Sequence, residues 1–501
     1  MDMFLGGLMA LANLQTLLMM IVGTLAGMIF AVIPGLTFST AMVLLVPFTF
    51  GLEPIGAVGL MMGVYAGGMC GGAFSAILLG IPGTPSAAAT VFDGHKMTLK
   101  GQGDKACGIA AFSSVFGGVF SLVVLMLLAP QIAKVAVKFG APVIFSLVIL
   151  GFSCVVSLSG KELIKGLLSG FIGLFLCCIG SDPVVGSARF TFGNVNLLAG
   201  INSMPVLIGI FALPEIINVF VEGRKAGGHL DSIAPDTKNV RAPFPSLKEI
   251  WSCRKQLLYS SVLGTCLGFI PGCAGPMAPF MAYDHCKRFT PDMGTGVIQG
   301  VAAPEAANNA TQGGAMIPMM ALGIPCDSCS AIILAAFTIH GFAPGPLLFQ
   351  NDGAFVYAVF IALVVIYLMA LGLQFWGIKA LMKILAVPKV QLMSVILVLA
   401  FVGAYAIDLN FVSIVVMFLS GFASYFMRHY GYPSMPLILG VVLGGTMESR
   451  LRAALSLTNG SLSIFTEQPL SLVFLGIALV ILLLPLINRI RSYRKKEEAQ
   501  A

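Results

Sequence analysis

The sequence predicts an all-α protein that crosses a lipid bilayer many times. Of its 501 residues, 58% are hydrophobic and 10% are charged, and the mean hydropathy is +0.97. A soluble domain carries roughly 25% charged residues. Glycine accounts for 58 residues, which suits close helix packing and interrupted helices in a membrane. The apolar stretches predict about 11 spans and two re-entrant hairpins, in two halves of opposite orientation.

The charged and cysteine residues exclude other classes. The net charge is +7, but Lys and Arg fall between apolar stretches, so the charge sets topology and indicates no nucleic-acid partner. Met1-Asp2-Met3 lacks the basic start of a secretory signal. Most of the 11 cysteines lie inside apolar segments and are expected to be small buried residues. The pair Cys326 and Cys329 is formally C-x-x-C, and small-residue packing is favoured there over metal or redox chemistry.

The first predicted repeat covers residues 1–221. No Lys or Arg precedes Lys96, so the N-terminus is expected outside, in the periplasm. Residues 11–50 predict a re-entrant hairpin with Pro34-Gly35 at its tip, and residues 54–92 predict a helix broken at 80–86 that crosses to the cytoplasm. Scaffold spans are expected within 107–221, near 107–129, 142–159, 162–180 and 197–221.

A basic cytoplasmic linker, residues 222–255, separates this repeat from the second, residues 256–501. Residues 257–283 predict a hairpin that enters from the cytoplasm, and 294–340 a helix broken at 323–325. Five scaffold spans are expected within 354–488, near 354–378, 391–406, 411–427, 434–457 and 470–488. A basic tail then places the C-terminus in the cytoplasm. This topology leaves 23 of the 28 Lys and Arg residues inside.

The two halves carry matching break motifs. Ile33-Pro34-Gly35 recurs as Ile270-Pro271-Gly272 at an offset of 237, and Gly80-Ile81-Pro82 recurs as Gly323-Ile324-Pro325 at 243. One such break alone would be read as a kink that only packs helices. Four breaks in two matched pairs indicate inverted repeats, which are typical of secondary transporters with a binding site near the bilayer midplane.

The breaks and the segment 302–331 are the expected binding site. That segment is polar within apolar sequence, and its prolines Pro304, Pro318 and Pro325 argue against one uninterrupted helix. Backbone N–H groups at half-helix starts suit a carboxylate, and carbonyl and hydroxyl oxygens suit Na⁺. The expected substrate and ion ligands are Pro34, Gly35, Thr37, Ser39, Thr40, Gly83, Thr84, Pro85, Ser86, Pro271, Gly272, Gly275, Asn308, Asn309, Thr311, Pro325, Asp327, Ser328 and Ser330. Within this set, Thr37, Thr84, Asn308 and Asn309 are the candidates for Na⁺.

Two acids lie in this apolar region, and intramembrane acids are functional by default. Glu305 and Asp327 could each bind a cation, relay a proton, or be neutral and hydrogen-bonded. Glu305 follows Pro304, so capping of a helix start is an equal alternative for it. His95, Lys96 and His340 are interpreted more simply as residues of the membrane edge.

Several of these blocks resemble one family. GIPGTPSAA at 80–88 with the following VFDGHKM, AAPEAANNATQGGAMIPMMALGIP from Ala302, HGFAPGPLLF from His340 and SDPVVGSARFTFG from Ser181 are similar to the large membrane subunit (TctA-like) of tripartite tricarboxylate transporters. The resemblance runs through nearly the whole chain. It implies a multi-pass protein of the bacterial inner membrane that moves substrate by alternating access, without enzymatic activity.

The resemblance also implies partners and cargo. The partners would be a small membrane subunit (TctB-like) and a periplasmic solute-binding protein (TctC-like). The substrates would be small tricarboxylates or dicarboxylates such as citrate, driven by Na⁺ or H⁺ as coupling ion, with no other cofactor. The two-hairpin layout is similar to that of elevator-type transporters, and a homodimer is compatible with it.

The chain departs from the family pattern where substrate is expected. Cys326-Asp327-Ser328-Cys329 replaces Gly and small residues, the tip 271–276 carries extra Cys and Pro, and Phe38 stands where a smaller residue is common. An acid at Asp327 would repel a trianion unless it is protonated or bound to a cation. The alternatives to a carrier of this class are a carboxylate or anion channel and a carrier of a non-citrate organic acid. Two further alternatives are a membrane-embedded enzyme and a scaffold without its own site. The sequence offers no nucleophile–base or metal motif for an enzyme.

Overall fold

The structure, a computed structural model, describes residues 2–157, 163–182, 186–225, 242–272, 275, 277–384 and 387–498. Most of the predicted linker, residues 226–241, and Cys273, Ala274 and Pro276 of the second hairpin tip lie outside the described residues. The chain forms two compact units. Unit 1 comprises residues 1–133 and 211–407, and unit 2 comprises residues 134–210 and 408–501. Each unit therefore draws on both predicted repeats, whose own boundaries stay a prediction.

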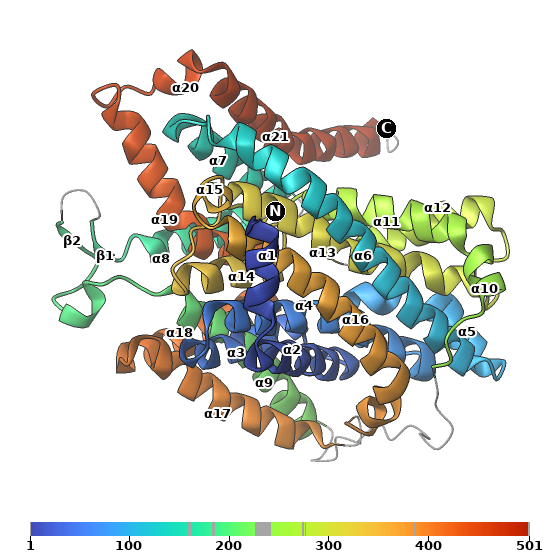
Figure 1. Cartoon of the computed structure of the whole chain (residues 1–501). Helices are drawn as coiled ribbons and strands as arrows, with labels where there is room; N and C mark the ends of the chain where they lie inside the picture. Colours follow the sequence, from blue (N-terminus) through green and yellow to red (C-terminus); the bar gives the residue numbers. More distant parts are fainter. Residues whose placement is uncertain are drawn as a thin grey trace. The chain divides into compact units, whose positions relative to one another are not determined.

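Unit 1 holds both predicted hairpins and both predicted broken helices (Figure 1). Its elements from the first half are α1 (Asp2–Leu11), α2 (Leu14–Val32), α3 (Phe38–Leu45), η1 (Val46–Gly51), α4 (Pro54–Leu79), η2 (Pro85–Ala88) and α5 (Val91–Leu99). Its elements from the second half are α10 (Leu247–Ser252), α11 (Arg254–Phe269), α12 (Met277–Phe289), α13 (Gln299–Leu322), α14 (Ser328–Ile339), α15 (Leu348–Asn351), α16 (Gly353–Ile384) and α17 (Lys389–Asp408).

Unit 2 is built from the remaining helices and one small sheet. Three helices continue from one unit into the other: α6 (Gly103–Ala136), α9 (Ser203–Lys225) and α17, whose last residue, Asp408, belongs to unit 2. The other elements are α7 (Ala141–Ser157), α8 (Leu163–Cys177), β1 (Gly180–Ser181), β2 (Ala188–Arg189), η4 (Val195–Leu197), α18 (Phe411–His429), α19 (Ser434–Ser456), α20 (Ile464–Glu467) and α21 (Pro469–Glu498). The two strands are antiparallel, and Gly180 pairs with Arg189.

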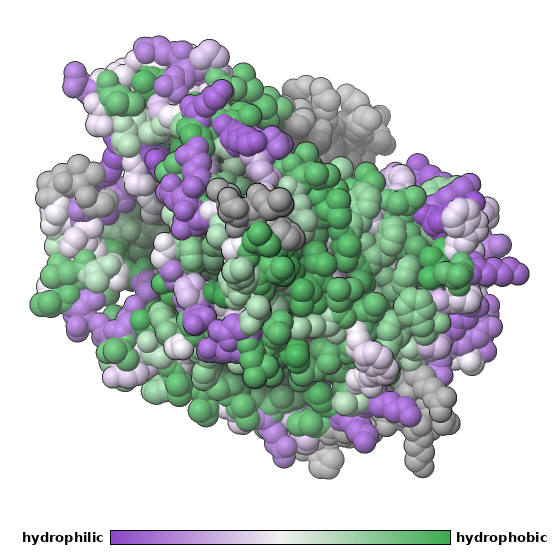
Figure 2. All heavy atoms as spheres, viewed as in Figure 1, coloured by the Kyte–Doolittle hydropathy of each residue, from purple (hydrophilic) through white to green (hydrophobic). Residues whose placement is uncertain are grey.

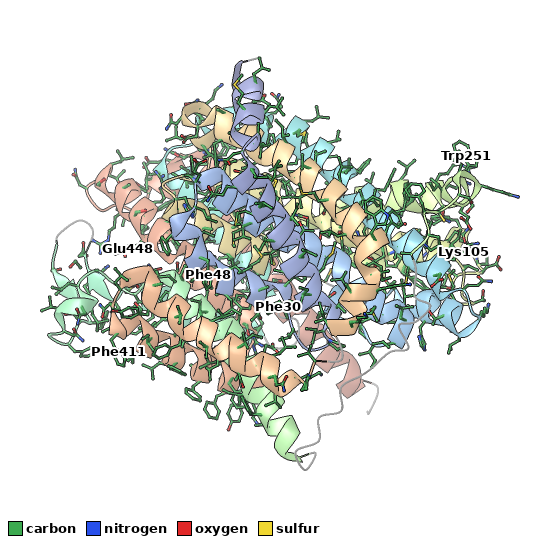
Figure 3. All side chains as sticks on the ribbon, turned by 60° about the horizontal axis from the view of Figure 1, so that its bottom comes forward. Phe30, Phe48, Lys105, Trp251, Phe411 and Glu448 are labelled. Carbon is green, nitrogen blue, oxygen red and sulfur yellow. The ribbon has the colours of Figure 1, made fainter. Side chains whose placement is uncertain are left out.

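Each expected scaffold span contains a helix, and the chain is an all-α polytopic membrane protein; the number of spans stays a prediction. Among the described residues, seven helices are long and apolar enough to cross a bilayer: α2, α4, α6, α9, α16, α17 and α18. The first hairpin arm, α2, has 19 residues and is itself long enough to cross. Hydrophobic side chains cover much of the face seen in Figure 2, and Phe48 and Phe411 in Figure 3 are large exposed examples. Such outward apolar surface suits contact with lipid.

The packing of each hairpin on its broken helix depends on glycine. A Cβ added at Gly27 of α2 would lie 2.2 Å from the carbonyl oxygen of Val64 in α4, and one added at Gly264 of α11 would lie 2.3 Å from that of Ala307 in α13. These pairs are related by the same offsets, 237 and 243, that relate the break motifs. Only glycine permits backbones to approach this closely. The α2–α4 and α11–α13 contacts thus resemble each other at matched positions of the two halves.

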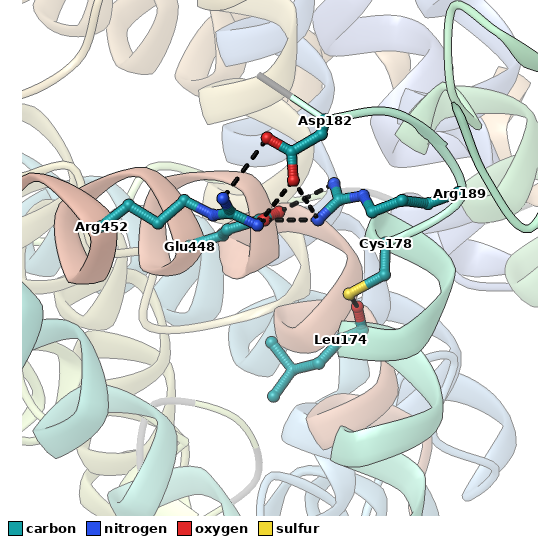
Figure 4. A network of polar contacts seen from close by, with 6 residues as sticks. All are labelled: Leu174, Cys178, Asp182, Arg189, Glu448 and Arg452. Carbon is teal, nitrogen blue, oxygen red and sulfur yellow. Dashed lines mark hydrogen bonds and ion pairs between the residues drawn. The ribbon is translucent and has the colours of Figure 1, made fainter. Parts of the chain in front are cut away.

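Unit 2 is stabilised by a charge network beside its strands (Figure 4). Arg189 Nη1 lies 2.6 Å from Glu448 Oε1, and Arg452 Nη2 lies 2.7 Å from Asp182 Oδ2 and 2.9 Å from Glu448 Oε1. Two arginines and two acids balance one another, so the network ties the β1–β2 hairpin to α19. Arg189 and Arg452 are two of the five basic residues that the predicted topology leaves outside or in the membrane.

Candidate functional site

The four predicted breaks are real interruptions of the helices, each marked by a glycine. Gly35 and Gly272 at the hairpin tips have φ of +91° and +83°, and Gly80 and Gly323 cap α4 and α13 with φ of +69° and +72°. Residues with a side chain rarely adopt this conformation, so glycine is required at all four turns. The segment 302–331 is not one uninterrupted helix, and its break lies at 323–325 as predicted; Pro304 and Pro318 lie inside α13, and only Pro325 lies at the break.

The chain resumes as short helices with polar residues at their starts. Thr37 is the N-cap of α3, Thr84 that of η2 and Asp327 that of α14. The Thr37 and Thr40 hydroxyl oxygens lie 2.8 Å apart, and those of Thr84 and Ser86 lie 3.1 Å apart. These polar groups sit where an apolar helix ends and another begins, as a midplane site requires.

Two turns of α4, residues Tyr65–Gly72, contact several of the predicted site residues; this segment is called the α4 hub. The Tyr65 hydroxyl donates to Asp327 Oδ2 at the start of α14. The Asn308 amide donates to the Met69 carbonyl at 2.9 Å. A Cβ added at Gly72 would lie 2.5 Å from Thr84 Oγ1. The hub therefore gathers groups from η2, α13 and α14 within one unit.

The first hairpin also reaches the hub. A Cβ added at Gly68 would lie 2.2 Å from Cγ of Phe38, and the Phe38 and Tyr65 rings stack with centroids 6.3 Å apart. Ser39 Oγ lies 3.2 Å from Cys329 Sγ. The large residue at position 38 thus fills space against the hub and beside the start of α14.

Asp327 caps the helix that follows it. Its Oδ1 accepts from the backbone N–H of Ser330 at 2.7 Å, and the Ser330 hydroxyl accepts from the Asp327 N–H at 2.9 Å. The second hairpin tip is fixed to the same break, because the Gly272 N–H donates to the Cys326 carbonyl at 2.7 Å. Asp327 is half-buried, and its carboxylate is held by the helix end on one side and by Tyr65 on the other.

The two asparagines face α4 from α13. Asn309 Oδ1 accepts from the Cys70 thiol at 3.2 Å, and its amide donates to the Glu305 carbonyl. Asn308 is 1% exposed, and within the described part of the chain its Oδ1 is a buried oxygen without a protein partner. A free amide oxygen in a buried polar setting is a suitable cation ligand.

The four Na⁺ candidates are not equally placed. Thr84 and Asn308 approach the α4 hub one turn apart, at Gly72 and Met69. The Thr37 hydroxyl is engaged at the start of α3, and Asn309 pairs with Cys70. The Thr311 hydroxyl bonds back to the Asn308 carbonyl at 2.6 Å, which is an ordinary helical arrangement.

The remaining predicted residues lie at the edges of the breaks. Gly83 packs on α2, since a Cβ there would lie 2.0 Å from the Ala31 carbonyl oxygen. Pro34 and Pro271 are half-buried turn residues, Pro85 is exposed, and Gly275 has open space around its Cα. Pro325 and Ser330 are buried, and Ser328 is half-buried. These positions shape the breaks, while the side-chain contacts across elements come from Ser39, Thr84, Asn308, Asn309 and Asp327.

Glu305 is fully buried and held by two hydroxyls. Thr90 donates to its Oε1 at 2.5 Å and Ser114 to its Oε2 at 3.1 Å. The capping alternative for Glu305 is wrong, because α13 already begins at Gln299. The carboxyl instead joins α13 to the segment before α5 and to α6.

Cys326 and Cys329 are both buried thiols. Within the described ranges, no group of three or more His, Cys, Asp or Glu residues is placed to hold a metal ion. The Cys326 thiol donates to the Phe269 carbonyl at 3.4 Å, so packing of small residues accounts for its contact.

Sequence reasoning missed three residues of this region: Tyr65, Cys70 and Asp93. The Asp93 carboxylate is fully buried and accepts from the N–H groups of Gly294, Gly296 and Val297 and from the Tyr283 hydroxyl at 2.6 Å. It thereby fastens α5, at the end of the first broken helix, to the loop before the second. The available signal was an acid within VFDGHKM, directly after the GIPGTPSAA block.

The comparisons with known proteins agree with these motifs. The chain is 32% identical over 479 residues to an uncharacterized 52.8 kDa protein in the TAR-I ttuC' 3' region of Agrobacterium vitis, covering 95% of this chain and 94% of that protein. It is 33% identical over 234 residues to a protein in the TAR-II ttuC' 3' region of the same organism, covering 46% of this chain and 97% of that protein. No solved structure matches the chain. The model of the tripartite tricarboxylate transporter TctA family, whose members work with TctB and TctC subunits, matches residues 17–439, and the chain belongs to this family.

Proposed function

We propose that this chain is the large transmembrane subunit of a binding-protein-dependent secondary transporter that imports small carboxylates by alternating access. The observation that carries the proposal is the repeated contact of Gly27 with Val64 and of Gly264 with Ala307. With the four matched breaks, it supports two structural repeats that each pair a hairpin with a broken helix. Repeats of this kind place the substrate between broken helices near the bilayer midplane. The binding site can then be exposed to one side of the membrane or to the other.

The opposite orientation of the repeats in the membrane has a direct test. Cysteines replace Trp251, exposed in α10, and Leu347, exposed before α15, in a chain without other cysteines. A membrane-impermeant maleimide should label position 347 from the periplasm and position 251 only after the membrane is opened. Labelling of both positions from one side would contradict the predicted crossing of the second broken helix. The inverted arrangement, with its periplasmic N-terminus and cytoplasmic C-terminus, depends on that crossing.

The proposed motion is that of an elevator, with unit 1 as the moving part. Support comes from the division of the chain into two units. Unit 1 contains both predicted hairpins, both broken helices and the polar segment 302–331. Spin labels at positions 48 and 411, one in each unit, should give two distance populations whose ratio responds to substrate. A pair at positions 48 and 251, both in unit 1, should keep one distance. A single unchanging distance for the first pair would refute the motion.

The partners and coupling ion follow from the same proposal. A TctC-like protein of the periplasm would deliver the carboxylate, a TctB-like subunit would complete the complex, and a Na⁺ or H⁺ gradient across the bacterial inner membrane would drive import. Asn308 Oδ1 and Thr84 Oγ1 are the oxygens best placed at the α4 hub for Na⁺. Asn308→Ala should raise the Na⁺ concentration needed for half-maximal uptake, whereas Thr311→Ala, which removes a hydroxyl bonded within its own helix, should not.

A further inference from the structure

The two broken helices differ at one matched position. Thr84 and Asp327 are related by the offset of 243, and both are extended N-cap residues at the restart of the helix. Thr84 offers a neutral hydroxyl 3.1 Å from that of Ser86. Asp327 instead places a carboxylate at the matching position of the second half. The two helix starts therefore have similar backbone geometry but differ in charge.

The Asp327 carboxylate occupies a place that suits a substrate carboxylate. Its Oδ1 accepts from the first turn of α14 and its Oδ2 from the Tyr65 hydroxyl. Helix starts attract anions through their unpaired N–H groups. Here the chain's own carboxylate already takes that position and leaves its negative charge beside the hub.

The segments that carry the first hairpin and both broken helices hold no Lys or Arg near their breaks to balance a second carboxylate. The sequence holds no Lys or Arg from residue 1 to 95 or from 289 to 378, which includes the first hairpin, both breaks and α13. Within the same stretch the Glu305 carboxyl is buried against Thr90 and Ser114. The stacked Phe38 and Tyr65 rings further restrict the space beside Asp327.

We propose that Asp327 sets the charge class of the substrate, so that this carrier takes small acids with a single carboxylate and a neutral hydrogen-bonding group and rejects dicarboxylates and tricarboxylates. This inference rests on the proposed function. The carboxylate binds toward Thr84 and Ser86, and a neutral group such as a hydroxyl donates toward Asp327. A second carboxylate would face Asp327 across a site of low dielectric constant, where like charges repel strongly.

The test measures binding of lactate, malate and citrate to the purified full chain, by the shift of its melting temperature at pH 7 with Na⁺ present. Two neutral variants keep an N-cap at α14: Asp327→Asn, and Asp327→Ser, which supplies the hydroxyl that Thr84 gives the first half. Asp284→Asn neutralises an exposed acid of the same unit as a matched control. The wild type and the control should bind lactate in preference to malate and citrate. Both Asp327 variants should bind malate and citrate roughly tenfold or more tightly than the wild type does.

The other outcomes separate the two levels of the proposal. If acids bind with the same order of affinity in the wild type and in both Asp327 variants, Asp327 does not set the charge class, while the proposed function stands. If both variants lose all three acids while the wild type binds them, Asp327 holds the coupling cation and this inference is overturned. If no protein of the set binds any of the three acids, this inference is overturned, while the proposed function is judged separately by uptake in the presence of the loaded binding protein.

Discussion

The matched glycine contacts lead to a quantitative prediction. In Gly27→Ala the new Cβ would lie 2.2 Å from the Val64 carbonyl oxygen, whereas ordinary contact begins at 3.4 Å. The obstacle is backbone, so α2 and α4 must separate by about an ångström. Overpacking of this kind costs about 1–3 kcal/mol. Gly264→Ala meets the Ala307 carbonyl oxygen at 2.3 Å and should cost a similar amount.

The control is Gly377→Ala in α16, where nothing lies within 4 Å of an added Cβ. Alanine in an open helical position stabilises by roughly 0.5–1 kcal/mol relative to glycine. In detergent, the melting temperature of purified Gly27→Ala and Gly264→Ala should therefore fall by similar amounts, while that of Gly377→Ala should hold or rise. The double variant should lose about the sum, because the two contacts are separate. Equal melting temperatures in all three single variants would refute the repeated-contact argument.

Three further predictions concern charged groups. Asp93→Asn replaces one of the two acceptor oxygens with an NH2 donor, which leaves N–H groups of the loop without an acceptor. Each unmatched donor costs about 1–3 kcal/mol. The melting temperature and the yield of folded protein should therefore fall. Glu448→Gln should destabilise more than the double change of Glu448 and Arg189 to Gln, because it leaves the Arg189 charge without its closest partner; thermal unfolding of the wild type and of these two variants decides this. Lys105, together with the N–H and the hydroxyl of Ser246, lowers the pKa of Glu249 to about 2, so this stabilisation is complete above about pH 4.5 and is lost as the pH falls toward 2. In Lys105→Met, infrared titration should find the Glu249 pKa closer to its ordinary value, with the Ser246 contribution retained.

Much of the fold follows from local sequence. Pro34-Gly35 and Gly323-Ile324-Pro325 end helices because proline lacks an N–H group and glycine adopts positive φ, and these effects need no tertiary contact. The prolines inside α13 show the limit of that reasoning. Pro304 lies near the helix start, and both Pro304 and Pro318 are buried. A helix can continue through a proline in such a place, because the missing backbone hydrogen bond is compensated by neighbouring protein groups.

The contacts of the site could not be read from the sequence in the same way. Tyr65 and Asp327 are 262 residues apart, and Cys70 and Asn309 are 239 apart. Their meeting depends on how α4 packs against the second half of unit 1, and no local pattern encodes that. In an apolar helix, Tyr65 looks like an ordinary aromatic residue. Only its fully buried hydroxyl, which needs a partner, sets it apart.

The central claim is that the chain is an ion-driven carrier that receives its substrate from a binding protein. The most direct measurement is uptake of a radiolabelled carboxylate into proteoliposomes that contain this chain and its small membrane subunit. Uptake should require the loaded periplasmic binding protein, should require an inward Na⁺ or H⁺ gradient, and should accumulate substrate above its external concentration. Equally fast flux without the binding protein or the gradient, stopping at equal concentrations, would contradict the account and identify a channel.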